Sequence, residues 1–198
     1  MLWLRADPEA LRELRLKRDL LRSQGYYFIE DPGGRWDVVV APLPGSPEMK
    51  YYEGFLKGVE DRRIVSERDP LAAISRAVAY PRQMFSRMIL AVDSGTSLCG
   101  LAALADGTVL EASSAPCDEV ARRAQELNIR VPHRRLWVVV GDGSGFEEVA
   151  RQLLELGLPM SFIDESGTTA LRIPLPLRLR DANARAAVAL ALRASVNH

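Results

Sequence analysis

The sequence predicts two parts: a small α+β module over residues 1–85 and an α/β domain over residues 86–198. The second part is predicted by two observations. Three apolar runs separated by glycine-containing turns follow one another between residues 88 and 113, as antiparallel strands do. Two further apolar runs then alternate with stretches of helical length, the pattern of parallel strands joined by helices. Together they predict a mixed five-stranded sheet with flanking helices.

The first part is predicted to have the order α-β-β-α-(β)-α. Asp7 and Pro8 mark the first helix start, because Asp is a favoured N-cap and Pro suits the first helical position. Gly25 closes that helix, and Pro81 ends the last one. The predicted helices span residues 7–25, 46–60 and 69–80, and the predicted strands span residues 26–30, 36–41 and 63–66. The aromatic residues are interpreted as core rather than as a base-stacking surface: Tyr26, Tyr27, Phe28, Trp36, Tyr51, Tyr52 and Phe55.

The elements of the second part follow from the same kinds of signal. Asp106-Gly107 is a hairpin turn signal, and Pro116 with Asp118 opens a helix. The predicted strands span residues 88–93, 98–105, 108–113, 136–141 and 160–163, and the helices span residues 116–127, 144–157 and 181–194. Right-handed crossovers would place the 88–93 strand at the centre, beside the 136–141 strand.

The composition argues against several classes of function. The chain has 26 basic and 26 acidic residues, so no net field attracts it to nucleic acid or membrane. The densest basic group is more typical of a solvated helix face: Arg12, Arg15, Lys17, Arg18 and Arg22. The sequence contains only His133 and His198, too few for a histidine-based triad or a catalytic zinc site.

The two cysteines and the N-terminus bear on the cellular compartment. Cys99 and Cys117 are far apart and form no CxxC motif, so neither a zinc site nor a disulfide framework is expected. The first residues lack a signal-peptide apolar region, and no apolar run reaches membrane-spanning length. A reducing cytoplasm is therefore expected.

Carboxylates stand where predicted strands end. Asp93, Asp142 and the Asp164-Glu165 pair follow three strands, and Asp181 opens the last helix. Open α/β sheets bind ligands at this edge, and crowded carboxylates persist best around divalent metal. Asp93, Asp142, the Asp164-Glu165 pair and Asp181 are therefore candidate ligands of a divalent metal such as Mg²⁺, which can activate water for phosphodiester cleavage.

Each carboxylate also has a purely structural interpretation, which the sequence leaves open. Asp93 could cap the backbone of its own turn, and Asp181 could be only a helix N-cap. Asp142 with Gly143 could form a turn, and Asp164-Glu165 could be loop residues in solvent.

Four segments of the second part resemble the motifs of one known family. They are Ala91–Thr96 with Gly100–Ala102, Val138–Gly141, Asp164–Thr169 and Asp181–Ala187. They resemble the Asp-x-Gly-Thr strand end with its glycine-led partner, the Val-Val-Gly strand end, the Asp-Glu-Arg-x-Thr-Thr segment and the Asp-Ala-x-Ala-Ala helix of the RuvC/YqgF branch of Holliday-junction resolvase-like proteins. The resemblance covers about Ile89 to Ala194 and implies a ribonuclease H-like fold.

The resemblance implies a function as well as a fold. Asp93, Glu165 and Asp181 would be the catalytic acidic triad, with Asp142 as a further metal ligand. The implied activity is metal-dependent cleavage of branched DNA or structured RNA, and homodimers are a possible assembly. The sequence departs from the family at Ser97–Cys99 and at Ser166, where basic residues are usual.

Two other readings compete with the nuclease. One is a catalytically weak or inactive resolvase-like module that binds nucleic acid or protein, favoured by the missing basic residues. The other takes Asp93-Ser-Gly-Thr as the phosphate loop of an actin-like sugar kinase or ATPase. Such enzymes need a second lobe with its own Asp-Gly-Thr strand, and the first eighty or so residues contain none.

Overall fold

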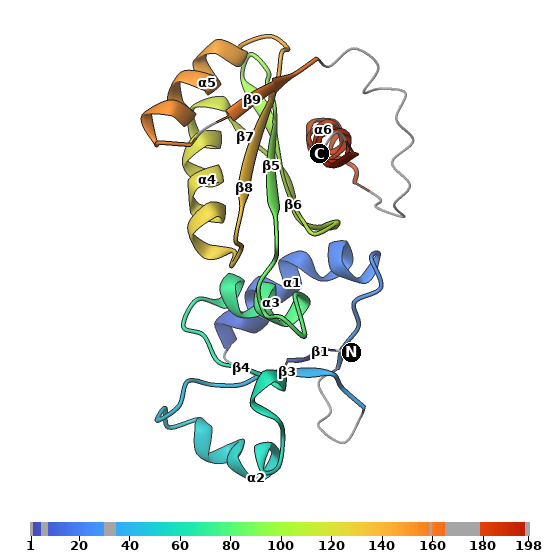
Figure 1. Ribbon diagram of the computed structural model, residues 1–198, viewed down its shortest axis with the longest axis vertical. Coiled ribbons are helices and arrows are strands. Elements are labelled where there is room, and N and C mark those ends of the chain that lie inside the picture. Colours follow the sequence, from blue (N-terminus) through green and yellow to red (C-terminus); the bar gives the residue numbers. More distant parts are fainter. Residues whose placement is uncertain (1, 5–7, 30–34, 159, 165–178, 197–198) are drawn as a thin grey trace. The chain divides into compact units, whose positions relative to one another are not determined.

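The computed structural model (Figure 1) describes residues 2–4, 8–29, 35–158, 160–164 and 179–196. The chain divides into two units: unit 1 is Met1–Phe85 with Arg130–Pro132, and unit 2 is Ser86–Ile129 with His133–His198. Among the described residues, no helix has both the length and the apolar character that a membrane span requires.

Unit 1 is built on a four-stranded sheet of order β2-β1-β3-β4. Its strands are β1 (Leu2–Leu4), β2 (Phe28–Ile29), β3 (Val38–Val40) and β4 (Ile64–Val65). Its helices are α1 (Pro8–Arg22), α2 (Glu53–Leu56) and α3 (Pro70–Val78), with 3-10 turns η1 (Met49–Tyr51) and η2 (Asp61–Arg63). The core includes Leu14 and Leu21 of α1, Ile74 of α3 and all of β3.

The α+β prediction for this unit was wrong, because all strand pairings among its described residues are parallel. The apolar run Leu2–Leu4 forms β1, which lies between β2 and β3. Strands β2 and β3 are consecutive in the predicted order, but they do not pair with each other; residues 30–34, which join them in sequence, lie outside the described residues. A three-residue strand carries too little periodicity to be recognised alone.

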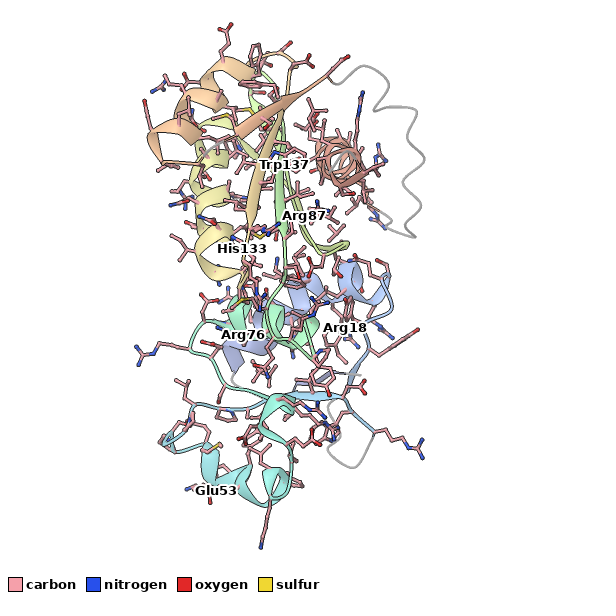
Figure 2. All side chains as sticks on the ribbon, viewed as in Figure 1. Arg18, Glu53, Arg76, Arg87, His133 and Trp137 are labelled. Atoms are coloured by element: carbon pink, nitrogen blue, oxygen red, sulfur yellow. A yellow bond between two sulfur atoms is a disulfide. The ribbon has the colours of Figure 1, made fainter. Side chains whose placement is uncertain are left out.

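The single helix predicted over residues 46–60 is instead broken into η1 and α2, neither of which contains a buried residue. Gly58, at a φ of +82°, interrupts the predicted helix directly after α2 and its C-cap Lys57. Two aromatic residues of this segment that were predicted as core are exposed, Tyr51 (67%) and Phe55 (51%), and so is Tyr27 (56%), which precedes β2. Glu53, labelled in Figure 2, lies in α2.

The third helix of unit 1, α3, begins where the sequence predicts. Asp69 caps α3, accepting a bond from Ala72 N at 2.8 Å. The basic group on α1 is not uniformly solvated, because Lys17 is only 6% exposed. Its Nζ lies 3.7 Å from a carboxylate oxygen of Glu13, one turn earlier, which offsets part of the cost of burying the ammonium group.

Unit 2 contains the predicted mixed five-stranded sheet, in the order β7-β6-β5-β8-β9. The strands are β5 (Met88–Asp93), β6 (Leu98–Ala105), β7 (Thr108–Pro116), β8 (Leu136–Gly141) and β9 (Met160–Ile163), and the helices are α4 (Cys117–Arg130), α5 (Phe146–Glu155) and α6 (Ala182–Val196). The β5–β6 and β6–β7 pairs are antiparallel, while β5–β8 and β8–β9 are parallel. The central position of β5 next to β8 is confirmed.

Helices cover both faces of this sheet: α4 and α5 lie on one face and α6 on the other (Figure 1). Beneath α6 the sheet presents small residues, such as the laterally paired Ala91 and Ala102, and α6 itself is rich in buried alanines, including Ala187 and Ala191. Small residues on both sides allow the helix to pack close to the strands.

The edge strand β9 differs from its prediction as a buried strand. Phe162 is 54% exposed, and its ring packs edge-on against Phe146 with centroids 5.6 Å apart. Within the part of the chain that the structure describes, β8 is the one strand that pairs with β9, and α5 shields β9 incompletely. On β8, Trp137 (labelled in Figure 2) donates from Nε1 to Ser161 Oγ at 3.2 Å.

Candidate functional site

The candidate site begins at a row of residues that crosses three strands. Asp93, the last residue of β5, is paired with Gly100 of β6, and Gly100 is paired with Ser114 of β7. Laterally paired residues direct their side chains to the same face of a sheet. Asp93 and Ser114 therefore share a face, with a glycine between them.

The glycine identifies which face this is. A Cβ added at Gly100 would clash with the backbone carbonyl of Asn183 and would lie 3.2 Å from the Cβ of Ala187. Both residues belong to α6, so the row faces that helix. The absence of a side chain at Gly100 lets the first turn of α6 approach the sheet directly beside Asp93.

Asp181 stands at the start of α6 and is its N-cap. Its Oδ1 accepts bonds from Asn183 N at 2.9 Å and Ala184 N at 3.2 Å, so both capping bonds use one carboxylate oxygen. The structural interpretation of Asp181 as a helix cap therefore applies. The cap leaves Oδ2 outside these two bonds.

The electrostatic surroundings of Asp181 favour the ionised carboxylate. The pKa of Asp181 is lowered, chiefly by the hydroxyl of Ser114; burial opposes this, and the backbone N–H groups of Ala184 and Asn183 and the charge of Arg185 lower the pKa further. Ser114 Oγ is shielded from solvent and approaches this carboxylate without a hydrogen bond of good geometry. The row thus links Asp93 to Asp181 through Gly100 and Ser114.

Asp142 lies at the same edge of the sheet but not in this row. The β5–β8 register ends at Val92 and Val140; continued by two residues, it places Asp142 beside Ser94, one position past Asp93. The ends of the two strands are joined, because Ser94 Oγ donates to the carbonyl of Gly141 at 2.9 Å. Asp142 is exposed, and strand alternation assigns it to the face opposite Asp93.

The end of β9 completes this edge. Asp164 follows β9, and Arg193 of α6 donates from Nη1 to its backbone carbonyl at 2.7 Å. α6 therefore carries a carboxylate at its beginning and a guanidinium group near its end, both at the edge where β5, β8 and β9 finish. The predicted catalytic residue Glu165 lies outside the described residues.

The two cysteines are bonded, so the expectation of no disulfide was wrong. Cys99 of β6 and Cys117 at the start of α4 form a disulfide, with Cα atoms 5.0 Å apart. Antiparallel pairing explains the proximity: Cys99 pairs with Ala115, two residues before Cys117. Sequence spacing alone could not reveal this, because the hairpin between them folds back on itself.

The next question is whether the described side chains could bind a metal ion. They include no group of three or more His, Cys, Asp or Glu residues able to hold a metal. Asp93 and Asp181 remain as two carboxylates on one face, with the shielded Ser114 hydroxyl beside them. That donor set fits Mg²⁺, which commonly takes one or two carboxylates and keeps water or phosphate oxygens as its other ligands.

Comparison with known proteins adds no assignment to this geometry. No protein-family model matches the chain, and no curated protein matches it in sequence.

Sequence reasoning missed two features of the site. Ser114 carries no motif, and it is recognisable only once the β6–β7 register is known. Gly100 belongs to one of the sequence motifs, but only its position under α6 shows that it is needed for close packing. In both cases the information lies in strand pairing.

Proposed function

We propose that unit 2 is a metal-dependent nuclease with a ribonuclease H-like fold, hydrolysing phosphodiester bonds in branched DNA or structured RNA. The observation that carries this proposal is the common face of Asp93 and Asp181 at the carboxyl end of the central strand. Two carboxylates held there by a strand end and a helix N-cap suit a divalent cation that also needs phosphate oxygens.

The chain's own residues have distinct tasks in this proposal. Asp93 is positioned by a strand paired on both sides, and Asp181 by the two N–H bonds of its cap. Ser114 helps to keep Asp181 ionised. A bound Mg²⁺ or Mn²⁺ would supply activation of water and stabilisation of the leaving oxygen. On the family resemblance we assign Glu165 as a third catalytic carboxylate; the resemblance also implies Asp142 as a further ligand, although strand alternation assigns Asp142 to the face opposite Asp93.

Calorimetric titration of Mg²⁺ and Mn²⁺ into the purified chain and into Asp93→Asn tests the proposal. We expect binding in the parent and its loss in the variant. Asp118→Asn is the matched control, because Asp118 is an exposed carboxylate in the first turn of α4, and it should bind as the parent does.

The titration is repeated with a four-way DNA junction present, since phosphate oxygens can complete the ligand shell. Cleavage of the junction is then assayed in the same samples, and Asp93→Asn should abolish it. Absence of metal binding both with and without the junction would overturn the nuclease proposal.

A second candidate is a resolvase-like module that binds nucleic acid or protein without cutting. It is favoured by the commitment of Asp181 Oδ1 to the helix cap and by Ser97–Cys99 and Ser166 in place of basic residues. Junction binding that is unchanged in Asp93→Asn, without cleavage by the parent, would select this candidate. Cytoplasmic location and homodimer formation remain predictions from the sequence and the resemblance.

A further inference from the structure

The turn after Asp93 is wedged between the disulfide and a second loop. The carbonyl oxygen of Gly95 lies 3.3 Å from Cys117 Sγ and 4.0 Å from Cys99 Sγ. On its other side, a Cβ added at Gly145 would collide with the same oxygen. Gly145 belongs to the loop between Asp142 and α5, so the disulfide and both carboxylate-bearing loops meet at one atom.

The backbone reinforces this contact. Cys117 N donates to the carbonyl of Ser97 at 3.1 Å, so the residue that carries the sulfur also holds the turn by its main chain. Two positions earlier in the turn, Gly95 leaves no room for a Cβ of its own beside the carbonyl of Leu98. The turn thus has little freedom to adjust if the sulfur atoms move.

We propose that the Cys99–Cys117 disulfide is a redox switch for the carboxylate site. When the bond is closed, it holds the turn that follows Asp93 in the position that supports metal binding. When the bond is opened, the turn is released and metal affinity falls. This proposal rests on the proposed function for its effect on metal, but not for its effect on the turn.

The two sulfur atoms differ in access, which decides the route of reduction. Cys99 is completely buried, whereas Cys117 is partly exposed. The thiolate of a protein dithiol would attack Cys117 Sγ, the S–S bond would break, and Cys99 would leave as a thiolate that takes up a proton. The second thiol of the reductant then displaces Cys117, completing a two-electron, two-proton exchange that oxidises the reductant to a disulfide.

Reduction changes the surroundings of Gly95 in two ways. Two separate thiols need more room than a bonded pair, and Cys99 is enclosed by the core, so the displacement is directed toward the turn. The covalent S–S link that fixes Cys117 Sγ 3.3 Å from the carbonyl of Gly95 is also replaced by a thiol that is free to rotate and whose S–H is only a weak hydrogen-bond donor. Both effects act on the residue two positions after Asp93.

The test compares air-oxidised protein with protein reduced by a water-soluble phosphine and desalted without oxygen. The phosphine takes up oxygen from water as the disulfide becomes two thiols. Mn²⁺ titration should show about tenfold weaker binding after reduction, the size typical of disturbing groups that orient metal ligands. Reoxidation with oxidised glutathione should restore it. Measurable binding with the same affinity in the two states would overturn the proposal.

A second measurement separates this proposal from the nuclease proposal. Amide hydrogen exchange should accelerate at residues 95–98 after reduction, while residues 138–140 of β8 stay protected. If neither state binds metal but the turn still loosens, the nuclease proposal fails and the switch stands. Exchange at the turn that is the same in both states would refute the switch.

The matched variant is Cys99→Ala/Cys117→Ala, which cannot form the bond. Its exchange at residues 95–98 should resemble that of the reduced parent and should not respond to the phosphine. Should this variant fail to fold, the reduced and reoxidised parent still supplies both measurements. A variant whose turn is as protected as that of the oxidised parent would count against the switch.

Discussion

The two sheets of this protein were formed from similar apolar runs but are organised differently. The strands of unit 1 are two or three residues long and all parallel. Those of unit 2 are four to nine residues long, and the longest two, β6 and β7, form an antiparallel hairpin. A hairpin sets its own register through its turn, whereas parallel strands depend on crossovers. In unit 2 this hairpin register brings Gly100 and Ser114 into one row with Asp93.

The units also differ in how they use glycine. Gly100 in unit 2 admits the backbone of α6 against the sheet, whereas Gly54 in unit 1 has open space around its Cβ position. The comparison thus distinguishes a glycine required by packing from one that lies within a helix and could carry a side chain without any contact. Three predictions follow this contrast, from the largest expected effect to the smallest.

Gly100→Ala should lower the free energy of unfolding by about 2 kcal/mol, the cost of forcing a methyl group into a packed interface. The added Cβ collides with backbone of α6, which cannot rotate away as a side chain could. Chemical denaturation measures the change. Gly54→Ala is the control and should be neutral or stabilising by about 0.5 kcal/mol; equal destabilisation by both would contradict the role of Gly100.

Asp69→Ala should cost about 1 kcal/mol through loss of the α3 N-cap. Asp69 accepts from Ala72 N at 2.8 Å and from Arg130 Nε at 2.7 Å, both within unit 1. Amide exchange should accelerate in α3 and not in β5. Asp19→Ala, an exposed change within α1, provides the comparison; if it destabilised the protein as much, the cap would not be the cause.

The smallest effect expected is on the acid dependence of stability. Burial alone would raise the pKa of Asp69, but the bonds from Arg130 and Ala72 outweigh it and the pKa is lowered; that of Asp181 is lowered as well. A lowered folded pKa gives stability that is present above the unfolded value of about 3.9 and is lost as pH falls through the folded value.

Stability measured from pH 6 downward should therefore decline below about pH 4. Asp181→Asn should make this decline shallower, because the amide does not titrate. An identical slope for variant and parent would show that Asp181 contributes nothing to the acid transition.

Much of unit 2 could be predicted because its signals are local and repeated. The observed limits of β5, β6, β8 and β9 are those predicted, and β7 is three residues longer. The Asp106-Gly107 turn has the positive φ angles, 45° and 88°, of the expected hairpin. The mixed five-stranded sheet followed from these elements and from the handedness of crossovers.

What could not be predicted depends on residues distant in sequence. β1 exists because β2 and β3 pair on either side of it, and the disulfide exists because β7 brings Cys117 back beside Cys99. Likewise the exposure of Phe162 depends on the position of β9 at the edge. In each case the residues that pack together are too distant in sequence for a local pattern to reveal the contact.

The sequence by itself determined which residues could act in this protein: the carboxylates at strand ends, the apolar strands and the glycines. Periodicity and capping are properties of neighbouring residues, so they can be read along the chain. Only the tertiary structure decided which of these residues meet. Asp93 and Asp181 share a face because Gly100 lets α6 approach the sheet, and the turn after Asp93 is held because a disulfide closes beside Gly95.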